Sequence, residues 1–386
     1  MNKIFRILFL LFFFLTLITN QSFAENTKIK IGLLVPLTGE NSNLGKEIVK
    51  ATRLAIMDIN SNKIEIYPKD TQSDPNITLR SAFELQKLGI NLIIGPIFYE
   101  NLSYLGEVQD VTFLSLTNKT IDLPKNVIST GINSVSQLNT IKKFIELNEI
   151  KKTIILIPNL NYDLEIKQGI KKSKIKTLKQ YYYDSEPTKL TKKIEKITNY
   201  EIRKQNLIDE ITRLENSEDP NKEKKIKNLE KKYSIGDVKF DSVIIADFDK
   251  SLKSVITSLL YTDVSPKNKH FITFNQWFDK SLINETSSQP IYFPSINKKN
   301  LDNFKKKFYL KFNQSPNHIS LLSYDLVGLI YYLSLKYEMS QPQINKVFNA
   351  KNSFKGKIGI FDIENNKINH RLNLYKIENG TLIEIF

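Results

Sequence analysis

Residues 28–59 read KIKIGLLVPLTGENSNLGKEIVKATRLAIMDI, and this stretch decides the fold. Residues 29–35 are almost all apolar, which is typical of a strand covered on both faces in a parallel sheet. Pro36 ends the strand because it has no amide hydrogen to donate, and Gly39 permits a sharp turn. Ser42 and Asn43 are predicted to cap the following helix, whose apolar residues recur every three or four positions. The stretch predicts a strand, a polar loop and a helix, the opening unit of a parallel α/β domain.

The composition suits a protein with sizeable cores and offers little material for catalysis. The chain has 386 residues, 41% hydrophobic and 25% charged, enough for two domains or one elaborated domain. It has no Cys, which excludes disulfides, thiolate metal sites and lipid attachment through Cys. Its three His residues are scattered, so we predict no metal and no other cofactor. The net charge of +15 comes from Lys spread along the whole chain, which indicates a composition bias and no nucleic-acid partner.

Residues 1–24 have the pattern of a cleavable export signal. Lys3 and Arg6 precede an apolar run at 7–17, and Ser22-Phe23-Ala24 is a small-x-small cleavage site. The apolar run is shorter than the roughly 20 residues that span a bilayer. We therefore expect cleavage after Ala24 and a mature protein in a bacterial periplasm that does not span the membrane.

Small or polar residues follow three successive strands of the first half. They are the turn at Asp70 to Pro75, Gly95-Pro96 and Thr117-Asn118-Lys119. The carboxyl ends of parallel strands share one edge of the sheet, and ligands bind at that edge. The repetition predicts a cleft there.

A second α/β lobe is predicted from about residue 135 onward. Its expected strands at 153–157, 241–246 and 270–274 are again each followed by polar or aromatic residues. The segment 188–234 interrupts this lobe and is dense in Lys and Glu, with apolar residues at helical spacing. We predict a helical hairpin there, either a solvated decoration or an arm that docks a partner.

The last third is predicted to return to helices and then to end in strands. Residues 319–337 are apolar almost all round, as expected of a buried helix. Strands at 358–363 and 372–377 are predicted to form a hairpin through the polar turn 364–366.

Four segments together resemble the type I periplasmic solute-binding proteins, and the leucine-binding branch in particular. A narrower likeness, to the penicillin-binding protein activators of that branch, rests on the charged insertion and on Asn275-Gln276-Trp277 with an acidic residue after it. The four segments are IGLLVPLTGENSNLG, IIGPIFYENL, LLSYDLVGLIYYL and SFKGKIGIFDIENNKINHRLNLYKIENG.

The resemblance implies an α/β fold of two Rossmann-like lobes with parallel central sheets, joined by a three-crossover hinge. The crossovers would fall near Gly131, Phe293-Pro294 and Gly356. Ligands in this family lie between the lobes and are trapped by hinge closure. On this pattern lobe one comprises residues 25–132 and 296–354, and lobe two comprises 133–295 and 355–386 with the hairpin insertion 188–234.

The same resemblance implies a set of ligand-binding residues that face each other across the cleft. Asp247 would serve as a partner for an ammonium group. This chain departs from amino-acid binders at Ile97-Phe98-Tyr99, where small hydroxyl residues are expected and bulky groups narrow the pocket. The predicted site residues are Thr38, Tyr99, Ser115 and Thr117 in lobe one and Tyr162, Asp247 and Trp277 in lobe two.

Two functions fit these observations. The first is a non-catalytic protein that traps a small polar ligand, such as an amino acid, for uptake by an ABC transporter permease. The alternative is an activator-like regulator that contacts a peptidoglycan synthase. An enzyme is disfavoured because the chain has no G-x-S-x-G, no H-E-x-x-H and no phosphate loop.

Overall fold

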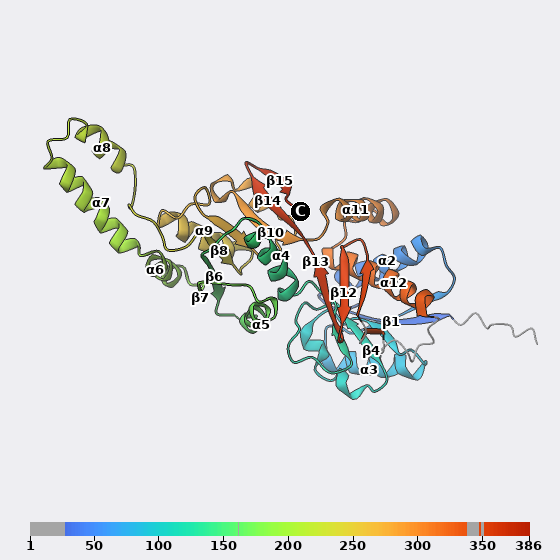
Figure 1. Cartoon of the computed structure of the whole chain (residues 1–386). Coiled ribbons are helices and arrows are strands. Elements are labelled where there is room, and N and C mark those ends of the chain that lie inside the picture. The colour runs from blue at the N-terminus through green and yellow to red at the C-terminus, as the bar shows by residue number, and fades with distance from the viewer. Residues whose placement is uncertain (1–27, 161, 338–346, 349–350) are drawn as a thin grey trace, which may run out of the picture.

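Two α/β lobes lie side by side, and an arm of helices extends from the second lobe (Figure 1). The computed structural model describes residues 28–160, 162–337, 347–348 and 351–386. The predicted export signal at 1–24 lies outside these residues. Each lobe is organised around a sheet of mainly parallel strands, which confirms the predicted fold class.

Lobe one has a five-stranded parallel sheet in the order β2-β1-β3-β4-β5. Successive residues of β1 face opposite sides: Leu33 packs in the apolar cluster with α2 and α12, and Leu34 packs in the cluster with α3. The elements are β1 (Ile29–Val35), α2 (Ser42–Ile59), β2 (Ile64–Asp70), α3 (Pro75–Lys87), β3 (Leu92–Ile94), η1 (Tyr99–Leu102), η2 (Leu105–Glu107), β4 (Thr112–Ser115), β5 (Val127–Ser129), α11 (Lys298–Phe312) and α12 (His318–Tyr337).

Lobe two has a seven-stranded sheet in the order β15-β14-β10-β9-β8-β6-β7, with β14 and β15 antiparallel to their neighbours. Helices α4 and α5 cover one face, and α6 and α9 cover the other. The elements are α4 (Ser134–Leu147), β6 (Thr153–Pro158), α5 (Asp163–Ser173), β7 (Lys179–Tyr183), α6 (Pro187–Thr198), α7 (Tyr200–Glu215), α8 (Lys222–Leu229), β8 (Ser242–Ile245), α9 (Asp249–Tyr261), β9 (His270–Thr273), α10 (Lys280–Asn284), η3 (Thr286–Ser288), β10 (Ile291–Ser295), β14 (Asn373–Glu378) and β15 (Thr381–Glu384).

A separate three-stranded antiparallel sheet corrects the predicted C-terminal hairpin. It consists of β11 (Asn352–Lys355), β12 (Ile360–Glu364) and β13 (Lys367–Arg371). The turn at 364–366 joins β12 to β13, and not to the strand at 372–377, because the polar stretch after the turn pairs in register with β12. The last crossing into lobe two therefore falls at Leu372, between β13 and β14, and later than the position expected near Gly356.

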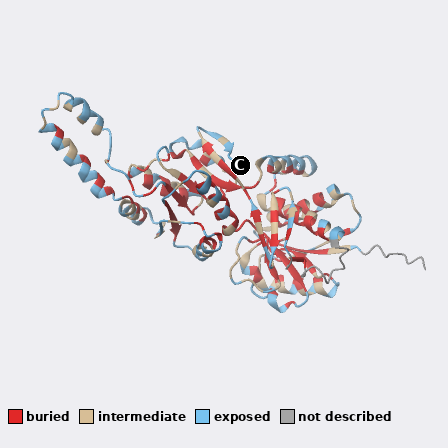
Figure 2. Ribbon diagram, in the orientation of Figure 1, coloured by how far each residue is buried: buried red, intermediate tan, exposed pale blue. Residues whose placement is uncertain are grey.

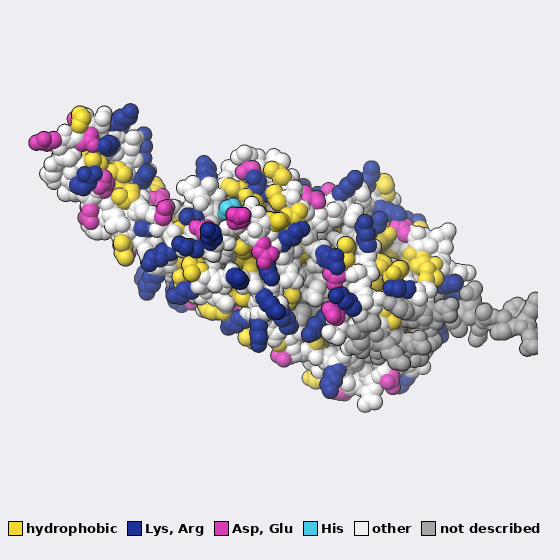
Figure 3. Space-filling view, in the orientation of Figure 1, with side chains coloured by type: hydrophobic (Ala, Val, Ile, Leu, Met, Phe, Trp, Pro, Cys, Tyr) yellow, Lys and Arg dark blue, Asp and Glu magenta, His cyan; other side chains and the backbone are white. Residues whose placement is uncertain are grey.

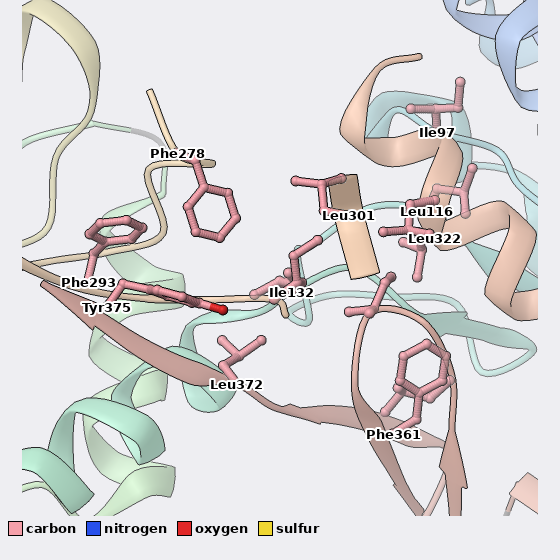
Figure 4. Packing of buried hydrophobic residues seen from close by; sticks show 14 of the residues in the cluster. Ile97, Leu116, Ile132, Phe278, Phe293, Leu301, Leu322, Phe361, Leu372 and Tyr375 are labelled. Atoms are coloured by element: carbon pink, nitrogen blue, oxygen red, sulfur yellow. The ribbon is translucent and has the colours of Figure 1, made fainter. Parts of the chain in front are cut away.

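One apolar cluster runs across the junction of the two lobes (Figure 4). Ile132 and Leu372, both on crossovers, lie in its middle and are almost fully buried. Because these residues pack against both lobes, the crossovers are part of the core and not loose linkers. On the lobe-one side the labelled residues are Ile97, Leu116 and Leu322, and on the lobe-two side Phe278, Phe293 and Tyr375.

Helix α12 is long and apolar enough to cross a membrane by length and composition, but it is a core helix of lobe one. It packs against α2, and its Leu321, Leu326 and Leu329 are fully buried. This placement explains why the helix is apolar almost all round.

The segment predicted as a helical hairpin divides into two parts. Helix α6 packs on α9 and contributes the buried Leu190 and Ile194 to the core of lobe two. Helices α7 and α8 pack on one another and project from the lobe; we call residues 200–234 the arm. Figure 2 shows that most of the arm surface is exposed.

The start of α2 differs from the sequence-based expectation. Neither Ser42 nor Asn43 caps the helix: the position before it is Asn41, which makes no capping bond, and the Ser42 amide donates to the Gly39 carbonyl at 3.2 Å. The tight turn at Gly39, with φ of 77°, thus supplies an acceptor for the first amide of the helix.

Candidate functional site

The ends of four strands from both lobes meet at one cavity. Strands β3 and β4 of lobe one and β8 and β9 of lobe two run toward it, and the start of α12 completes it. The cavity has a volume of about 330 Å³. It is lined by Ile97, Phe98, Tyr99, Glu100, Leu116, Thr117, Asn118, Lys119, Gly131, Ile132, Gln137, Phe248, Asn275, Trp277, His318, Ile319, Leu322 and Ile358.

The lobe-one wall carries an aromatic ring flanked by charges. Tyr99 donates its hydroxyl to the Ile121 carbonyl at 3.3 Å, which fixes the ring along the wall. The Lys119 ammonium lies 4.3 Å from the centre of that ring, within the range of a cation–π contact. Glu100 lines the same wall and is exposed. Burial raises the pKa of the Tyr99 hydroxyl, so this group stays neutral at ordinary pH.

The lobe-two wall presents an amide donor that has no partner among the described residues. The backbone amide of Trp277 and the hydroxyl of Ser295 both donate to the Asn275 side-chain oxygen, at 2.9 and 2.8 Å. A backbone N–H can only donate, so the orientation of this amide is settled. Asn275 is 4% exposed, and its Nδ2 is buried with no hydrogen-bond acceptor in the described chain. A buried donor without an acceptor is costly, so a ligand oxygen that reached Nδ2 would be stabilising.

A ring stack connects the lobes at the cavity. Trp277 follows β9 in lobe two, His318 begins α12 in lobe one, and their ring centres lie 3.9 Å apart with planes at 20°. Burial, with a smaller effect of Lys305, lowers the pKa of His318 to about 4. The imidazole is therefore neutral near pH 7, and the pair forms an uncharged aromatic boundary.

Of the seven predicted site residues, three line the cavity and four do not. Tyr99, Thr117 and Trp277 line the cavity. Ser115 is fully buried and donates to the Pro96 carbonyl at 2.9 Å, so it holds the strand-end turn. Thr38 is exposed and donates to the Asp70 carboxylate at 2.6 Å, away from the cavity.

Asp247 and Tyr162 belong to a polar network inside lobe two. Tyr183 donates to one Asp247 carboxylate oxygen at 2.5 Å, and the other oxygen accepts from the Phe248 amide at 2.8 Å and from Tyr162 at 3.4 Å. Burial raises the pKa of Asp247, and the hydrogen bonds from Tyr183 and Phe248 oppose that rise. These contacts occupy both oxygens, so Asp247 anchors the loop after β8 while the neighbouring Phe248 reaches the cavity.

Sequence reasoning missed four residues that line the cavity. Asn275 and Phe248 follow β9 and β8, so the rule that the ends of parallel strands share one edge could have found them. The side chain of Gln137, on the first turn of α4, accepts a hydrogen bond from the backbone amide of Asn275 at 2.7 Å. His318 lies far along the chain at the start of a core helix, and no local pattern marks it.

Other kinds of site have little support in the described part of the chain. Within residues 28–160, 162–337, 347–348 and 351–386 no group of three or more His, Asp or Glu side chains is placed to hold a metal ion. Figure 3 shows basic side chains spread over the visible face with acidic ones among them, and not gathered into one patch.

The N-terminal part of the chain is similar to a known family of sequences. Residues 28–174 match the family model described as periplasmic binding protein. An uncharacterized protein of Methanocaldococcus jannaschii is 31% identical over 111 residues. That match covers 27% of this chain and only 25% of the relative.

Solved structures of similar fold are found among both amino-acid-binding proteins and a regulator. The C-terminal domain of LpoA from Haemophilus influenzae, a regulator of PBP1A, has a TM-score of 0.62 at 15% identity, covering 92% of this chain and all of that one. An ABC transporter substrate-binding protein from Desulfitobacterium hafniense, solved with Leu, has a TM-score of 0.61 at 13% identity, covering 93% and 100%. The leucine-binding protein LivK from Thermotoga maritima has a TM-score of 0.56 at 13% identity, covering 93% and 98%. At these identities the likeness concerns the fold.

Proposed function

Because this chain has the type I periplasmic binding protein fold, we propose that it is a non-catalytic solute-binding protein. The cavity between the lobes takes a small solute with an apolar part and a hydrogen-bond-accepting group, such as an apolar amino acid. The bound solute is delivered to an ABC transporter permease. We expect the predicted export signal at residues 1–24 to direct this activity outside the cytoplasm.

The observation that carries this proposal is the unpartnered amide of Asn275. Its Nδ2 is buried at the cavity wall, and its orientation is held by Trp277 and Ser295. A carboxylate or carbonyl oxygen of a solute would supply the missing acceptor and remove the cost of the unsatisfied donor. A cleft between lobes with a few fixed polar groups among apolar walls is the usual form of a small-molecule site.

The remaining walls match a solute with an apolar part. Phe98, Phe248 and Leu322 supply apolar surface from three separate elements. Lys119 and Glu100 provide one cation and one anion at the lobe-one wall, an arrangement that suits a zwitterion. The bulky residues after Gly95-Pro96 leave a volume of about 330 Å³, near the lower end of the usual range for ligand pockets, which favours a small solute.

The only tryptophan of the chain makes this proposal directly testable. Trp277 lies at the cavity, so its fluorescence reports occupancy of the cleft. The mature protein would be titrated with apolar amino acids, with the matching amides that lack a carboxylate, and with small peptidoglycan fragments. A true ligand should change the Trp277 emission and raise the thermal midpoint, since saturation at a hundred times Kd adds about 2.7 kcal/mol of stability.

A matched pair of variants separates recognition from folding. Asn275→Asp keeps the oxygen that accepts from Trp277 and Ser295 but replaces the donor, so affinity for a carboxylate should fall at least tenfold, about 1.4 kcal/mol. Ser295→Ala removes one hydrogen bond to that oxygen, yet it leaves Nδ2 in place, so this variant should keep the affinity of the wild-type protein. Equal affinity in both variants, or no response of the wild-type protein to any of the solutes, contradicts the proposal.

A second candidate function is a regulator that works by protein contact, and the arm favours it. The arm projects from lobe two, and its Ile202, Ile208 and Tyr233 are 64, 49 and 69% exposed. Hydrophobic side chains are visible on the arm in Figure 3. Exposed apolar residues on a projecting helix pair suit contact with a partner, which would be a peptidoglycan synthase if the chain works as its LpoA-like fold suggests.

The two functions can be told apart by removing the arm. The Ile235 amide donates to the Arg203 carbonyl at 3.0 Å, so the two ends of the arm are adjacent and a short Gly-Ser linker can replace residues 205–232. Binding of the purified synthase from the same organism would be compared for the intact and the shortened protein. Loss of that binding, with an unresponsive Trp277, supports the regulator. Unchanged binding, or none in either protein, argues against it.

A further inference from the structure

A second and larger cavity lies at the junction of the lobes, apart from the cleft. Its volume is about 560 Å³. Three parts of the chain enclose it: the connection between β4 and β5 in lobe one, the helices α4 and α5 in lobe two, and the β12–β13 hairpin. It shares no lining residue with the cleft, and neither the family match nor the predicted site assigns it a role.

The charged side chains around this cavity are mostly basic. Lys125, Lys172 and Lys367 come from the β4–β5 connection, α5 and β13, and Asp122 is the only acidic residue that lines the cavity. In the described part of the chain none of these lysines has a carboxylate within 4 Å, although several other lysines form such pairs. Burial, followed by the charge of Lys367, lowers the pKa of Lys172. Like charges therefore converge here without a direct ion pair, and Asp122 at the wall and the charge of Glu165 near Lys172 offset them only in part.

Amide groups add further donors to the same wall. Asn139, Asn365 and Asn366 line the cavity, and so does Asn369. The Asn369 side-chain oxygen accepts from Asn133 at 3.3 Å, which leaves the Asn369 NH₂ as the group available to a ligand. Scattered solvated lysines would be the default on a chain of net charge +15. Here, however, cations from three distant segments and several amides surround one hollow, and that is the donor set an anion requires.

We propose that this cavity, which we call the hinge cavity, binds a multivalent anion that carries phosphate or carboxylate groups. The ammonium groups of Lys125, Lys172 and Lys367 supply the charge, and the asparagine amides supply directed hydrogen bonds. Apolar residues such as Val127 and Ile368 at the cavity wall leave room for a non-polar part of the ligand.

An anion bound in the hinge cavity would contact segments of both lobes and so affect how the lobes are arranged. The β4–β5 connection lines the cleft at Thr117 to Lys119 and the hinge cavity from Thr120 to Lys125. An anion held by Lys125 of lobe one and Lys172 of lobe two joins the two lobes directly. Binding there stabilises one lobe arrangement, and the cleft is affected to the extent that its ligand prefers the same arrangement.

Calorimetric titration of the full mature chain with pyrophosphate and with citrate, at constant ionic strength, tests the proposal and distinguishes the two anion chemistries. Binding of either probe is expected. Lys172→Gln/Lys367→Gln should weaken it at least tenfold, and Asp122→Asn should tighten it because the only lining carboxylate is removed. Lys171→Gln/Lys176→Gln removes the same number of charges from exposed positions outside the cavity and should change the affinity less than twofold.

Three results would overturn the proposal. They are no binding of either probe to the wild-type protein, equal weakening by the two double variants, and a failure of Asp122→Asn to tighten binding. Equal weakening would mean that only the net charge attracts the probes. All four lysines are exposed on the surface, so the variants should fold, and thermal unfolding without a probe checks this.

Discussion

Buried polar side chains hold the segment before β12 and the first crossover in place. Asp325 on α12 accepts from the Ile358 amide at 2.6 Å, and burial raises its pKa to about 6. A Cβ added at Gly356 would lie 2.4 Å from the same carboxylate oxygen, so only glycine fits beside Asp325. His370 has a comparable role at the first crossover, where its Nε2 donates to the Thr130 carbonyl at 2.8 Å.

The burial of His370 leads us to predict that the folded protein loses stability in mild acid. It is buried, its Nδ1 has no partner among the described residues, and burial lowers its pKa to about 4 from the ordinary 6.5. The unfolded chain therefore takes up a proton at higher pH than the folded chain, so this contribution to stability is full above pH 6.5 and is lost as the pH falls toward 4. Between pH 7 and pH 5 the loss should be on the order of 2 kcal/mol.

Urea unfolding at the two pH values measures this effect. His370→Gln keeps a donor for the Thr130 carbonyl but cannot titrate, so its stability should depend less on pH than that of the wild-type protein. His318 has a similarly lowered pKa and remains in the variant, so part of the dependence should persist. An unchanged pH dependence in His370→Gln would contradict the assignment.

At the scale of the elements, the helices differ in how many buried apolar side chains they contribute to the cores of the lobes. Helix α12 places Leu321, Leu326 and Leu329 in the core of lobe one. The arm does not contribute in this way: Leu207 and Leu214 are buried, yet they lie outside the three apolar clusters of the described chain. The arm is therefore an independent attachment, and α6 is part of lobe two.

Removing the arm should leave the lobes nearly as stable as before. Replacement of residues 205–232 by a short Gly-Ser linker deletes exposed helix and keeps Arg203, whose guanidinium donates to the Gly236 and Thr262 carbonyls at 2.9 and 2.8 Å. We expect a thermal midpoint within a few degrees of the intact protein and a lower helical content by circular dichroism. A large drop in the midpoint would show that the arm supports the core, and Arg203→Ala in the intact chain provides a destabilised reference.

At the scale of the whole molecule, one carboxylate connects the lobes beside the cleft. Glu165 on α5 of lobe two accepts from the Thr120 amide, the Thr120 hydroxyl and the Ile121 amide of lobe one, at 2.7, 2.9 and 2.9 Å. Together with the stack of Trp277 on His318, this contact holds the lobes in the arrangement of Figure 1.

Glu165→Gln should shift the protein toward more open arrangements. The substitution replaces one charged acceptor oxygen by a donor that faces backbone amides, and hydrogen bonds to charged groups contribute about 1.5–3 kcal/mol each. Small-angle X-ray scattering should show a larger radius of gyration than for the wild-type protein. Glu146→Gln, at an exposed position that pairs only weakly with Lys142 at 3.9 Å, is the matched control, and an equal radius in both variants would contradict this role for Glu165.

Much of the architecture could be predicted because it rests on local patterns. The apolar run at 29–35 and the helical periodicity after it establish a β-α unit, since a strand covered on both faces needs helices around it. Repetition of that unit predicts two parallel sheets. The resemblance to the solute-binding family led to Tyr99, Thr117 and Trp277, all of which follow parallel strands whose ends meet at one edge.

The sequence by itself thus determined the α/β class, the two lobes and the edge where a ligand would bind. Only the tertiary structure decided which side chains are free to act there. Asp247 is occupied by Tyr183, and Ser115 by the Pro96 carbonyl. Asn275, in contrast, keeps a donor that finds no partner among the described residues, and His318 is brought to Trp277. The physical reason is that a hydrogen-bond partner or a stacked ring comes from a segment far along the chain, and local periodicity carries no information about where the crossovers bring it.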